Sequence, residues 1–231
     1  MASIFEEWSP ITRDFGLIQC SVDQVARGNL EWAAEHRMMF TRRALKCSLA
    51  EKFEALLPLS NSKNRRLFIP TNCGWVAFFQ NGIQGSDPAF NMMRLSLRLG
   101  VIAMRVCRAP PEARYQSVIW EVFATEELGG TRHGYRRSIA ASDDGGRWIF
   151  EESGARYPFE QVEHYSAKRK RDRFTPEMLD LYLSHFGILK PGDNLLNSAI
   201  DKPAVLLERK NSSGLPEFTL EQAKQGLPWK R

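Results

Sequence analysis

The sequence lacks a long hydrophobic run. Its longest uninterrupted apolar stretches, such as Trp75–Phe79, fall far short of the roughly 18 residues that a transmembrane helix needs. The segment Met1–Trp8 carries acidic side chains where a secretory signal would place Lys or Arg, and no apolar segment follows it. We therefore expect a cytoplasmic protein with no membrane association.

Cysteine is scarce, and its spacing matches no metal site. The four cysteines are Cys20, Cys47, Cys73 and Cys107, with no C-x-x-C pair and no zinc-ribbon spacing. An even number of cysteines could form disulfides, but a reducing cytoplasm is the simpler explanation. No H-x-x-x-H or H-E-x-x-H pattern occurs either, so we expect no metal and no cofactor.

Catalytic motifs are also missing. There is no G-x-S-x-G elbow, and Gly82-x-x-Gly85 is neither a Walker nor a Rossmann pattern. The sequence therefore marks no catalytic residue, which favours a non-enzymatic protein without excluding an enzyme.

Material for a hydrophobic core is abundant. Hydrophobic residues make up 43% of the 231 residues, with 14 Phe and 6 Trp, so wholesale disorder is excluded. No internal repeat or linker divides the body. We expect a single α+β domain over residues 1–188, followed by a partly irregular C-terminal extension over 189–231.

Local patterns predict the elements of an antiparallel sheet packed with helices. A hairpin over about 65–80 and a meander over about 101–152 follow from alternating apolar residues and turn residues. Capping patterns and terminal glycines predict helices over about 22–39, 48–57, 87–99 and 176–186. In the third helix Ser86 or Asp87 is the expected N-cap, Phe90, Met93 and Leu97 lie on one face, and Gly100 ends the helix.

The net charge of +5 is distributed unevenly. Residues 1–35 carry two basic and six acidic groups, whereas residues 36–66 carry eight basic and two acidic groups. The densest basic run is Lys168-Arg169-Lys170-Arg171-Asp172-Arg173. Such patches suit either a phosphate backbone or an acidic partner protein, and a solvated segment without a partner would look the same.

A second candidate surface follows the segment 132–137. On a strand, His133, Tyr135 and Arg137 would share one face and could hold a phosphate or a carboxylate. The same stripe could also be the solvent face of a sheet. Together the candidate binding residues are Arg42, Arg43, Arg65, Arg66, His133, Tyr135, Arg137, Lys168, Arg169, Lys170, Arg171 and Arg173.

Two segments of the chain carry a resemblance. One is Leu67-Phe-Ile-Pro-Thr-x-x-Gly-Trp-x-Ala-Phe-Phe-x-Asn81 with Gly85-Ser-Asp87, and the other runs from Lys168 to Leu179. They resemble uncharacterised bacterial proteins grouped with the immunity proteins of toxin systems, over about half the chain and through structural motifs. The resemblance implies a small non-enzymatic cytoplasmic protein that binds and neutralises a partner protein, and it assigns no binding residues.

Three functional hypotheses remain open. The first is an immunity-like protein-interaction module, in which charged patches steer encounter and exposed tryptophans among Trp8, Trp32, Trp75 and Trp229 serve as anchors. The second is a nucleic-acid-binding protein that uses the basic segments 36–66 and 168–173. The third is an enzyme with an anion site around His133 and Arg137. The sequence leaves the oligomeric state open.

Overall fold

A computed structural model describes residues 4–110, 113, 115–189, 195–196, 202–210, 214 and 216–225. Its helices are α1 (Ile4–Glu7), α2 (Val22–Glu35), α3 (Leu49–Glu54), α4 (Ala89–Leu99), α5 (Pro176–Ser184) and α7 (Leu220–Lys224). Short 3-10 helices are η1 (Glu126–Leu128), η2 (Val162–Ser166) and η3 (Lys170–Asp172).

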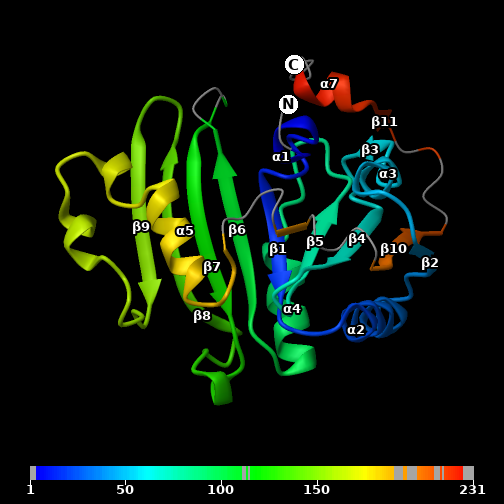
Figure 1. The fold of residues 1–231 in the computed structure, drawn as a ribbon, viewed down its shortest axis with the longest axis horizontal. Coiled ribbons are helices and arrows are strands. Elements are labelled where there is room, and N and C mark those ends of the chain that lie inside the picture. The colour runs from blue at the N-terminus through cyan, green and yellow to red at the C-terminus, as the bar shows by residue number, and fades with distance from the viewer. Residues whose placement is uncertain are drawn as a thin grey trace.

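The strands form one large sheet and one small one. The strands of the two sheets are β1 (Asp14–Ile18), β2 (Phe40–Leu45), β3 (Leu59–Ser60), β4 (Arg65–Pro70), β5 (Val76–Gln80), β6 (Ala103–Ala109), β7 (Ser117–Phe123), β8 (Tyr135–Asp143), β9 (Trp148–Gly154), β10 (Ala204–Arg209) and β11 (Glu217–Phe218). The large sheet has nine strands in the order β2-β10-β4-β5-β1-β6-β7-β8-β9, and β11 pairs with β3. In Figure 1 the large sheet runs from β9 on the left to β2 on the right.

Every pairing in the large sheet is antiparallel, which confirms the predicted α+β fold. The predicted hairpin is β4–β5, with Phe68 opposite Phe78, and the predicted meander is β6–β7–β8–β9. Proline is typical of edge strands, yet β4, which ends at Pro70, is an interior strand. Pro70 lies beyond the pairing with β10, which ends at Phe68, so its missing N–H breaks no hydrogen bond there.

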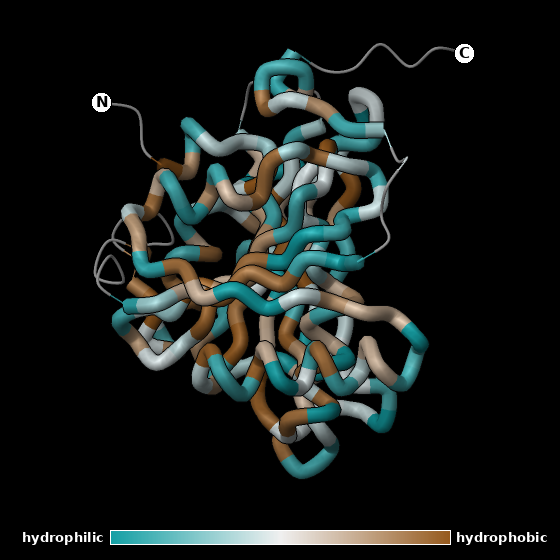
Figure 2. Tube along the Cα trace, turned by 90° about the vertical axis from the view of Figure 1, so that its right-hand side faces the viewer, coloured by the Kyte–Doolittle hydropathy of each residue, from teal (hydrophilic) through white to brown (hydrophobic). Residues whose placement is uncertain are grey.

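Two hydrophobic cores lie on the two faces of the sheet. The larger core packs α3, α5 and the segment after α1 against one face, with Trp8, Phe53, Phe79, Trp120 and Leu179 all buried. The smaller core packs α2 and α4 against the other face through Val25, Phe68, Phe78, Met92 and Leu207. Hydrophobic stretches accordingly gather along the middle of the molecule in Figure 2.

The helices α2 and α4 cover only part of their face. The smaller core takes no buried residue from β8 or β9. On that part of the sheet Ser138 lies opposite Ser153, and Ala140 lies opposite Glu151. Small and polar side chains are typical of a sheet face that contacts water. The pair α2–α4 is therefore the only helical layer, among the described residues, on this face.

Local capping signals are confirmed at most predicted helices. Ser21 and Gln24 form a capping box at α2, Ser48 and Glu51 form one at α3, and Gly100 ends α4 in the left-handed region. Three predicted ends were too late, because α2 ends at Glu35, α3 at Glu54 and α5 at Ser184. After α2 the chain turns through Arg37, whose φ of 55° cannot continue a helix.

The predicted N-cap of α4 is wrong. Pro88 occupies the cap position without a side-chain hydrogen bond. Ser86 instead donates to the Ile11 carbonyl (2.8 Å) and accepts from the Gln80 backbone (3.0 Å), while Asp87 pairs with Lys63 (2.9 Å). These residues fix the loop to its neighbours rather than the helix start.

The C-terminal segment takes part in the sheet. β10 lies between β2 and β4, with Leu206 and Leu207 buried on opposite faces. The boundary expected at residue 188 therefore does not separate the tail from the folded body.

Candidate functional site

The strongest candidate site lies between α2, α4 and the sheet. α2 supplies Asn29 and Trp32, α4 supplies Asn91 and Arg94, and Arg66 rises from β4. The polar side chains are all at least nine-tenths buried: Asn29, Arg66, Asn91 and Arg94, with Gln80 of β5 beside them. We call these five residues with Trp32 the arginine cluster.

Neutral amide groups hold the two guanidinium groups in place. Arg66 Nη1 donates to Asn29 Oδ1 (2.5 Å), and Arg94 Nη2 donates to Asn91 Oδ1 (2.8 Å). Asn91 is itself fixed, because its Nδ2 donates to Gln80 Oε1 (3.2 Å). Hydrogen bonds from both helices thus anchor the arginines without neutralising them.

Aromatic rings complete the surroundings of the arginines. The guanidinium carbon of Arg94 lies 4.0 Å from the centroid of the Trp32 ring, and that of Arg66 lies 5.8 Å from it. Arg66 also lies 4.7 Å from the centroid of the Phe40 ring. Stacking of this kind favours the cation over an uncharged group.

Within the described residues, neither arginine forms an ion pair. Burial, with the nearby charge of Arg209, lowers the pKa of Arg66 to about 10. Burial, with the charges of Arg66 and Arg98, lowers the pKa of Arg94 to about 9. Both groups therefore stay charged at pH 7, and their unneutralised charges destabilise the native state.

Helix α4 buries the polar residues Asn91, Arg94 and Ser96 together with two core residues, and it leaves two other apolar side chains exposed. Phe90 is 57% exposed and Leu97 is 39% exposed, with Met93 half-buried between them. The stripe identified from the sequence is therefore only partly outward: Phe90 and Leu97 reach solvent, whereas Met93 packs against the smaller core. We call the stripe of Phe90, Met93 and Leu97, together with Trp32, the α2–α4 surface.

Trp32 connects this surface to the arginines below it. Its ring meets that of Phe90 edge to face, with centroids 6.2 Å apart, and it stacks on Arg94. At its margin Arg98 pairs with Glu31 (3.5 Å) and with Glu35. An apolar centre with a charged rim is the usual composition of a protein interface.

Of the four tryptophans proposed as anchors, Trp32 is the one that the described structure leaves partly exposed. Trp8 and Trp75 are buried in the larger core, and Trp229 lies outside the described residues. Trp32 is half-buried on the α2–α4 surface, so part of its ring faces solvent.

The predicted binding residues of the basic segment 36–66 lie on two different strands, β2 and β4, and do not form one site. Arg42 is exposed on β2 and pairs with Asp23, and Arg43 is exposed beside it. Arg65 pairs with Glu208 (2.7 Å) across β4 and β10. Only Arg66 belongs to the arginine cluster.

The predicted stripe of His133, Tyr135 and Arg137 does not form. His133 lies in an exposed turn before β8, where its Nε2 accepts from Arg132 Nε (3.0 Å). An irregularity in the pairing of β7 with β8 separates the other two residues. Tyr135 packs against Phe123 of the smaller core, whereas Arg137 is buried on the larger-core face.

Arg137 serves the structure rather than an open anion site. Its Nε and Nη2 donate to the two carboxylate oxygens of Glu160 (2.9 and 2.6 Å), and Glu152 pairs with it too. Tyr165 also donates to Glu160 (2.9 Å). This buried network fixes the segment after β9 to the sheet.

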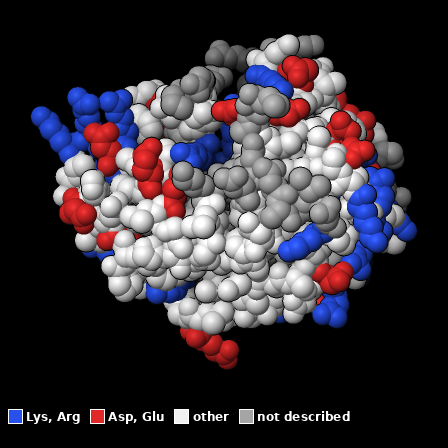
Figure 3. Space-filling model, in the orientation of Figure 1, with Lys and Arg blue, Asp and Glu red and all other residues white. Residues whose placement is uncertain are grey.

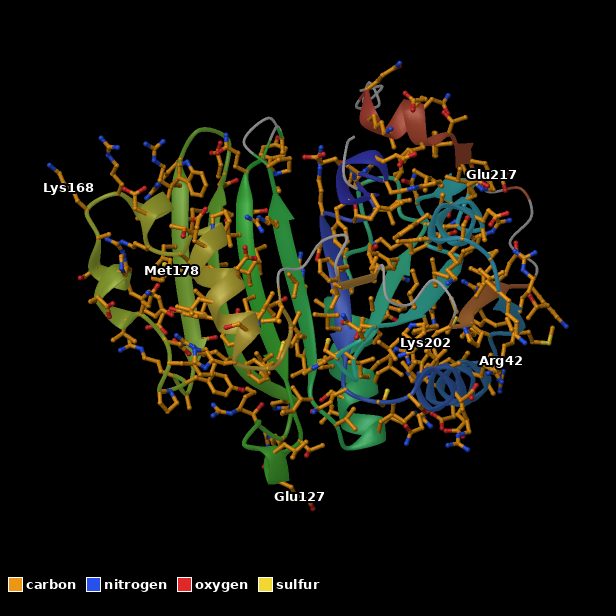
Figure 4. All side chains as sticks on the ribbon, viewed as in Figure 1. Arg42, Glu127, Lys168, Met178, Lys202 and Glu217 are labelled. Atoms are coloured by element: carbon orange, nitrogen blue, oxygen red, sulfur yellow. The ribbon has the colours of Figure 1, made fainter. Side chains whose placement is uncertain are left out.

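The run 168–173 is a solvent-facing loop at the other end of the sheet. Lys168, Arg169 and Arg171 are exposed, Lys170 is half-buried, and Arg173 donates to the Ala167 carbonyl (2.8 Å). Figure 4 shows Lys168 at the far left and Arg42 at the right. The basic side chains accordingly form separate groups in Figure 3, so the two basic segments do not form one continuous surface.

The residues of the arginine cluster that sequence reasoning missed are Asn29, Gln80, Asn91 and Arg94. A polar residue one position after an apolar one is ordinary on an exposed helix, so periodicity gave no reason to place Asn91 and Arg94 inside. For Asn91 and Arg94 the available signal was the apolar stripe of α4, because its exposed side chains leave these polar neighbours on the buried side. No such signal marks the residues of the cluster outside α4.

The groups gathered at this site determine what it can do chemically. The described residues hold no group of three His, Cys, Asp or Glu side chains placed to bind a metal ion. All four cysteines are free thiols, and burial raises the pKa of Cys20 to about 11, which disfavours a thiolate nucleophile. Guanidinium and amide groups bind and orient an anion, and the rings offer apolar contact.

The fold and site thus define an α+β protein with a nine-stranded antiparallel sheet and a buried arginine cluster beneath the α2–α4 surface. The chain matches no protein-family model, no curated protein and no solved structure. No helix in the described part of the chain is long and apolar enough to cross a membrane.

Proposed function

We propose that this protein is a non-enzymatic, immunity-like protein-interaction module that binds its partner through the α2–α4 surface. The observation that carries the proposal is the orientation of α4. This helix exposes Phe90 and Leu97 and buries the charged Arg94, which is the reverse of what stability alone favours. Departures from the stable pattern concentrate at functional sites.

The composition of the surface indicates the chemistry of the partner. The apolar stripe and Trp32 require apolar side chains opposite them, since burial of such groups supplies most binding energy. Arg66 and Arg94 require an anionic group, because no carboxylate in the described chain neutralises them. We therefore propose a partner that presents an apolar patch with an anionic group beside it.

This geometry supports protein binding more than nucleic-acid binding. A nucleic-acid surface needs basic residues along a continuous path, and here the segments 36–66 and 168–173 lie at opposite ends of the sheet. We take a cytoplasmic location as part of the proposal, because an immunity-like protein acts on its partner inside the cell.

The test compares two leucine variants by affinity capture from the native host and mass spectrometry. Leu97 on α4 and Leu181 on α5 are both 39% exposed, on opposite faces of the sheet. A stoichiometric partner should be captured by the wild type and by Leu181→Asp but lost with Leu97→Asp. Equal capture by all three would show that the α2–α4 surface is not the binding site, and co-purified nucleic acid alone would support the rival function.

A further inference from the structure

The arginine cluster has a one-sided shortage of hydrogen-bond acceptors. Among the described residues four buried nitrogen atoms of the cluster have no partner: Arg66 Nε, Arg94 Nε, Arg94 Nη1 and Asn29 Nδ2. All four are donors. A buried donor without a partner costs free energy, and a buried cation without a counter-charge costs more. The missing component is therefore an anion that accepts several hydrogen bonds.

Charge and geometry decide which anion fits. Two guanidinium groups bring two positive charges to the Trp32 ring. A single carboxylate brings one negative charge, whereas a phosphoryl group brings about 1.5 to 2 and three acceptor oxygens. We infer that the arginine cluster is a binding site for one phosphoryl group, held between Arg66 and Arg94.

A comparison within the molecule supports this assignment. Arg137 is buried to a similar degree, and two carboxylates, Glu152 and Glu160, neutralise it. The same fold thus supplies carboxylates where a buried arginine is structural. At Arg66 and Arg94 it supplies Asn29, Asn91 and Gln80, which orient the guanidinium groups and leave their charge for a ligand.

On this inference a phosphoryl group enters from the α2–α4 surface, and the cluster side chains shift to admit it, because the unpartnered donor atoms are covered in the free protein. Arg66 and Arg94 retain 9% and 8% exposure, and Trp32 and Phe90 stand beside them. A phosphoryl group carried on an aromatic side chain would contact these rings as well, whereas inorganic phosphate would contact only the arginines and amides. This inference goes beyond the proposed function, because a phosphoryl group can bind at the arginine cluster with or without a protein partner.

The test uses inorganic phosphate on the full-length protein at constant ionic strength. Calorimetric titration and thermal unfolding should show phosphate binding and a rise in Tm, while acetate at equal ionic strength gives neither. Arg94→Met and, separately, Arg66→Met should each weaken phosphate binding at least about tenfold, which is the loss expected from a charge-assisted hydrogen bond. The control Arg171→Met removes an exposed arginine of the 168–173 loop and should leave binding unchanged.

Two results would overturn the inference. One is phosphate binding that is equally strong in the wild type, Arg94→Met and Arg66→Met; the other is no phosphate binding by the wild type. Phenyl phosphate distinguishes the sources of the phosphoryl group. Tighter binding than inorganic phosphate supports a phosphorylated aromatic side chain, and equal binding supports free phosphate. Partner capture by Leu97→Asp is measured separately, so failure of either proposal leaves the other testable.

Discussion

Arg94 and Arg137 are both buried, yet their surroundings differ in charge. Burial would lower the pKa of Arg137, but hydrogen bonds to Glu160 and Glu152 outweigh it and raise that pKa above its ordinary value. Arg94 has no carboxylate to offset burial, and its pKa falls to about 9. Arg137 therefore belongs to a structural network, and Arg94 is available to a ligand.

Removal of Arg94 should stabilise the free protein. In phosphate-free buffer we expect Arg94→Met to raise the free energy of unfolding by on the order of 1–4 kcal/mol, because it removes a buried unneutralised charge while the Met side chain keeps contact with the Trp32 ring. Urea denaturation measures the change. A large loss of stability would mean that Arg94 is a structural residue.

Removal of Arg137 should have the opposite effect. Arg137→Met leaves Glu160 buried without its cation, so we expect a loss of about 3–5 kcal/mol. The double variant Arg137→Met/Glu160→Met should recover part of that loss, because neither charge then remains without the other. Urea denaturation of the two single variants, Arg137→Met and Glu160→Met, and of the double variant gives the coupling energy.

The ionised Glu152 carboxylate should make the free energy of unfolding depend on pH. Hydrogen bonds from Arg156, and then from Arg137, hold its pKa below the ordinary value of 4.5. Its contribution is therefore fully present above about pH 4.5 and is lost as the pH falls through the lower, folded-state pKa. The stability difference between the wild type and Glu152→Gln should be constant from pH 6 to about 5 and shrink in more acid solution; a difference that grows on acidification would contradict this assignment.

At the scale of elements, α4 shows both the reach and the limit of sequence reasoning. The Phe90, Met93 and Leu97 spacing identified an apolar stripe, and Gly100 correctly marked the helix end. Spacing alone does not say whether such a stripe faces the core or a partner. That choice depends on contacts with α2 and β1, which are distant from α4 in sequence.

Contact between α4 and β1 depends on a glycine. A Cβ atom at Gly16 would overlap the side chain of Met92. We expect Gly16→Ala to lower the free energy of unfolding by about 1–3 kcal/mol through overpacking. A double-mutant cycle with Met92→Ala should recover part of this loss, and strictly additive effects would show that the two residues do not press on each other.

At the scale of the whole molecule, the order of the strands in the large sheet could not be predicted from the sequence. Hairpin and meander pairings join neighbouring segments, so turn residues predict them. β1 between β5 and β6, and β10 between β2 and β4, form through contacts far apart in the chain. Such pairings leave no local pattern, and the basic residues of β2 and β4 were therefore grouped as one patch although the strands are separated.

The position of β10 makes the C-terminal segment essential to folding. Truncation after residue 188 removes β10 and leaves β2 without its only sheet partner among the described residues. We expect that truncated protein to lose cooperative thermal unfolding. Truncation after residue 210 retains β10 and is the control, for which cooperative unfolding should persist; an intact transition in the shorter protein would show that β10 is dispensable.

The most direct test of the proposed function is site-specific photo-crosslinking in the native host. A photoreactive phenylalanine analogue replaces Leu97 on the α2–α4 surface or, as a control of equal exposure, Leu181 on the opposite face. Our proposal expects one discrete cross-linked partner protein from position 97 and none from position 181. The same cross-linked partner from position 181, with none from position 97, would contradict the assignment of the α2–α4 surface as the binding site.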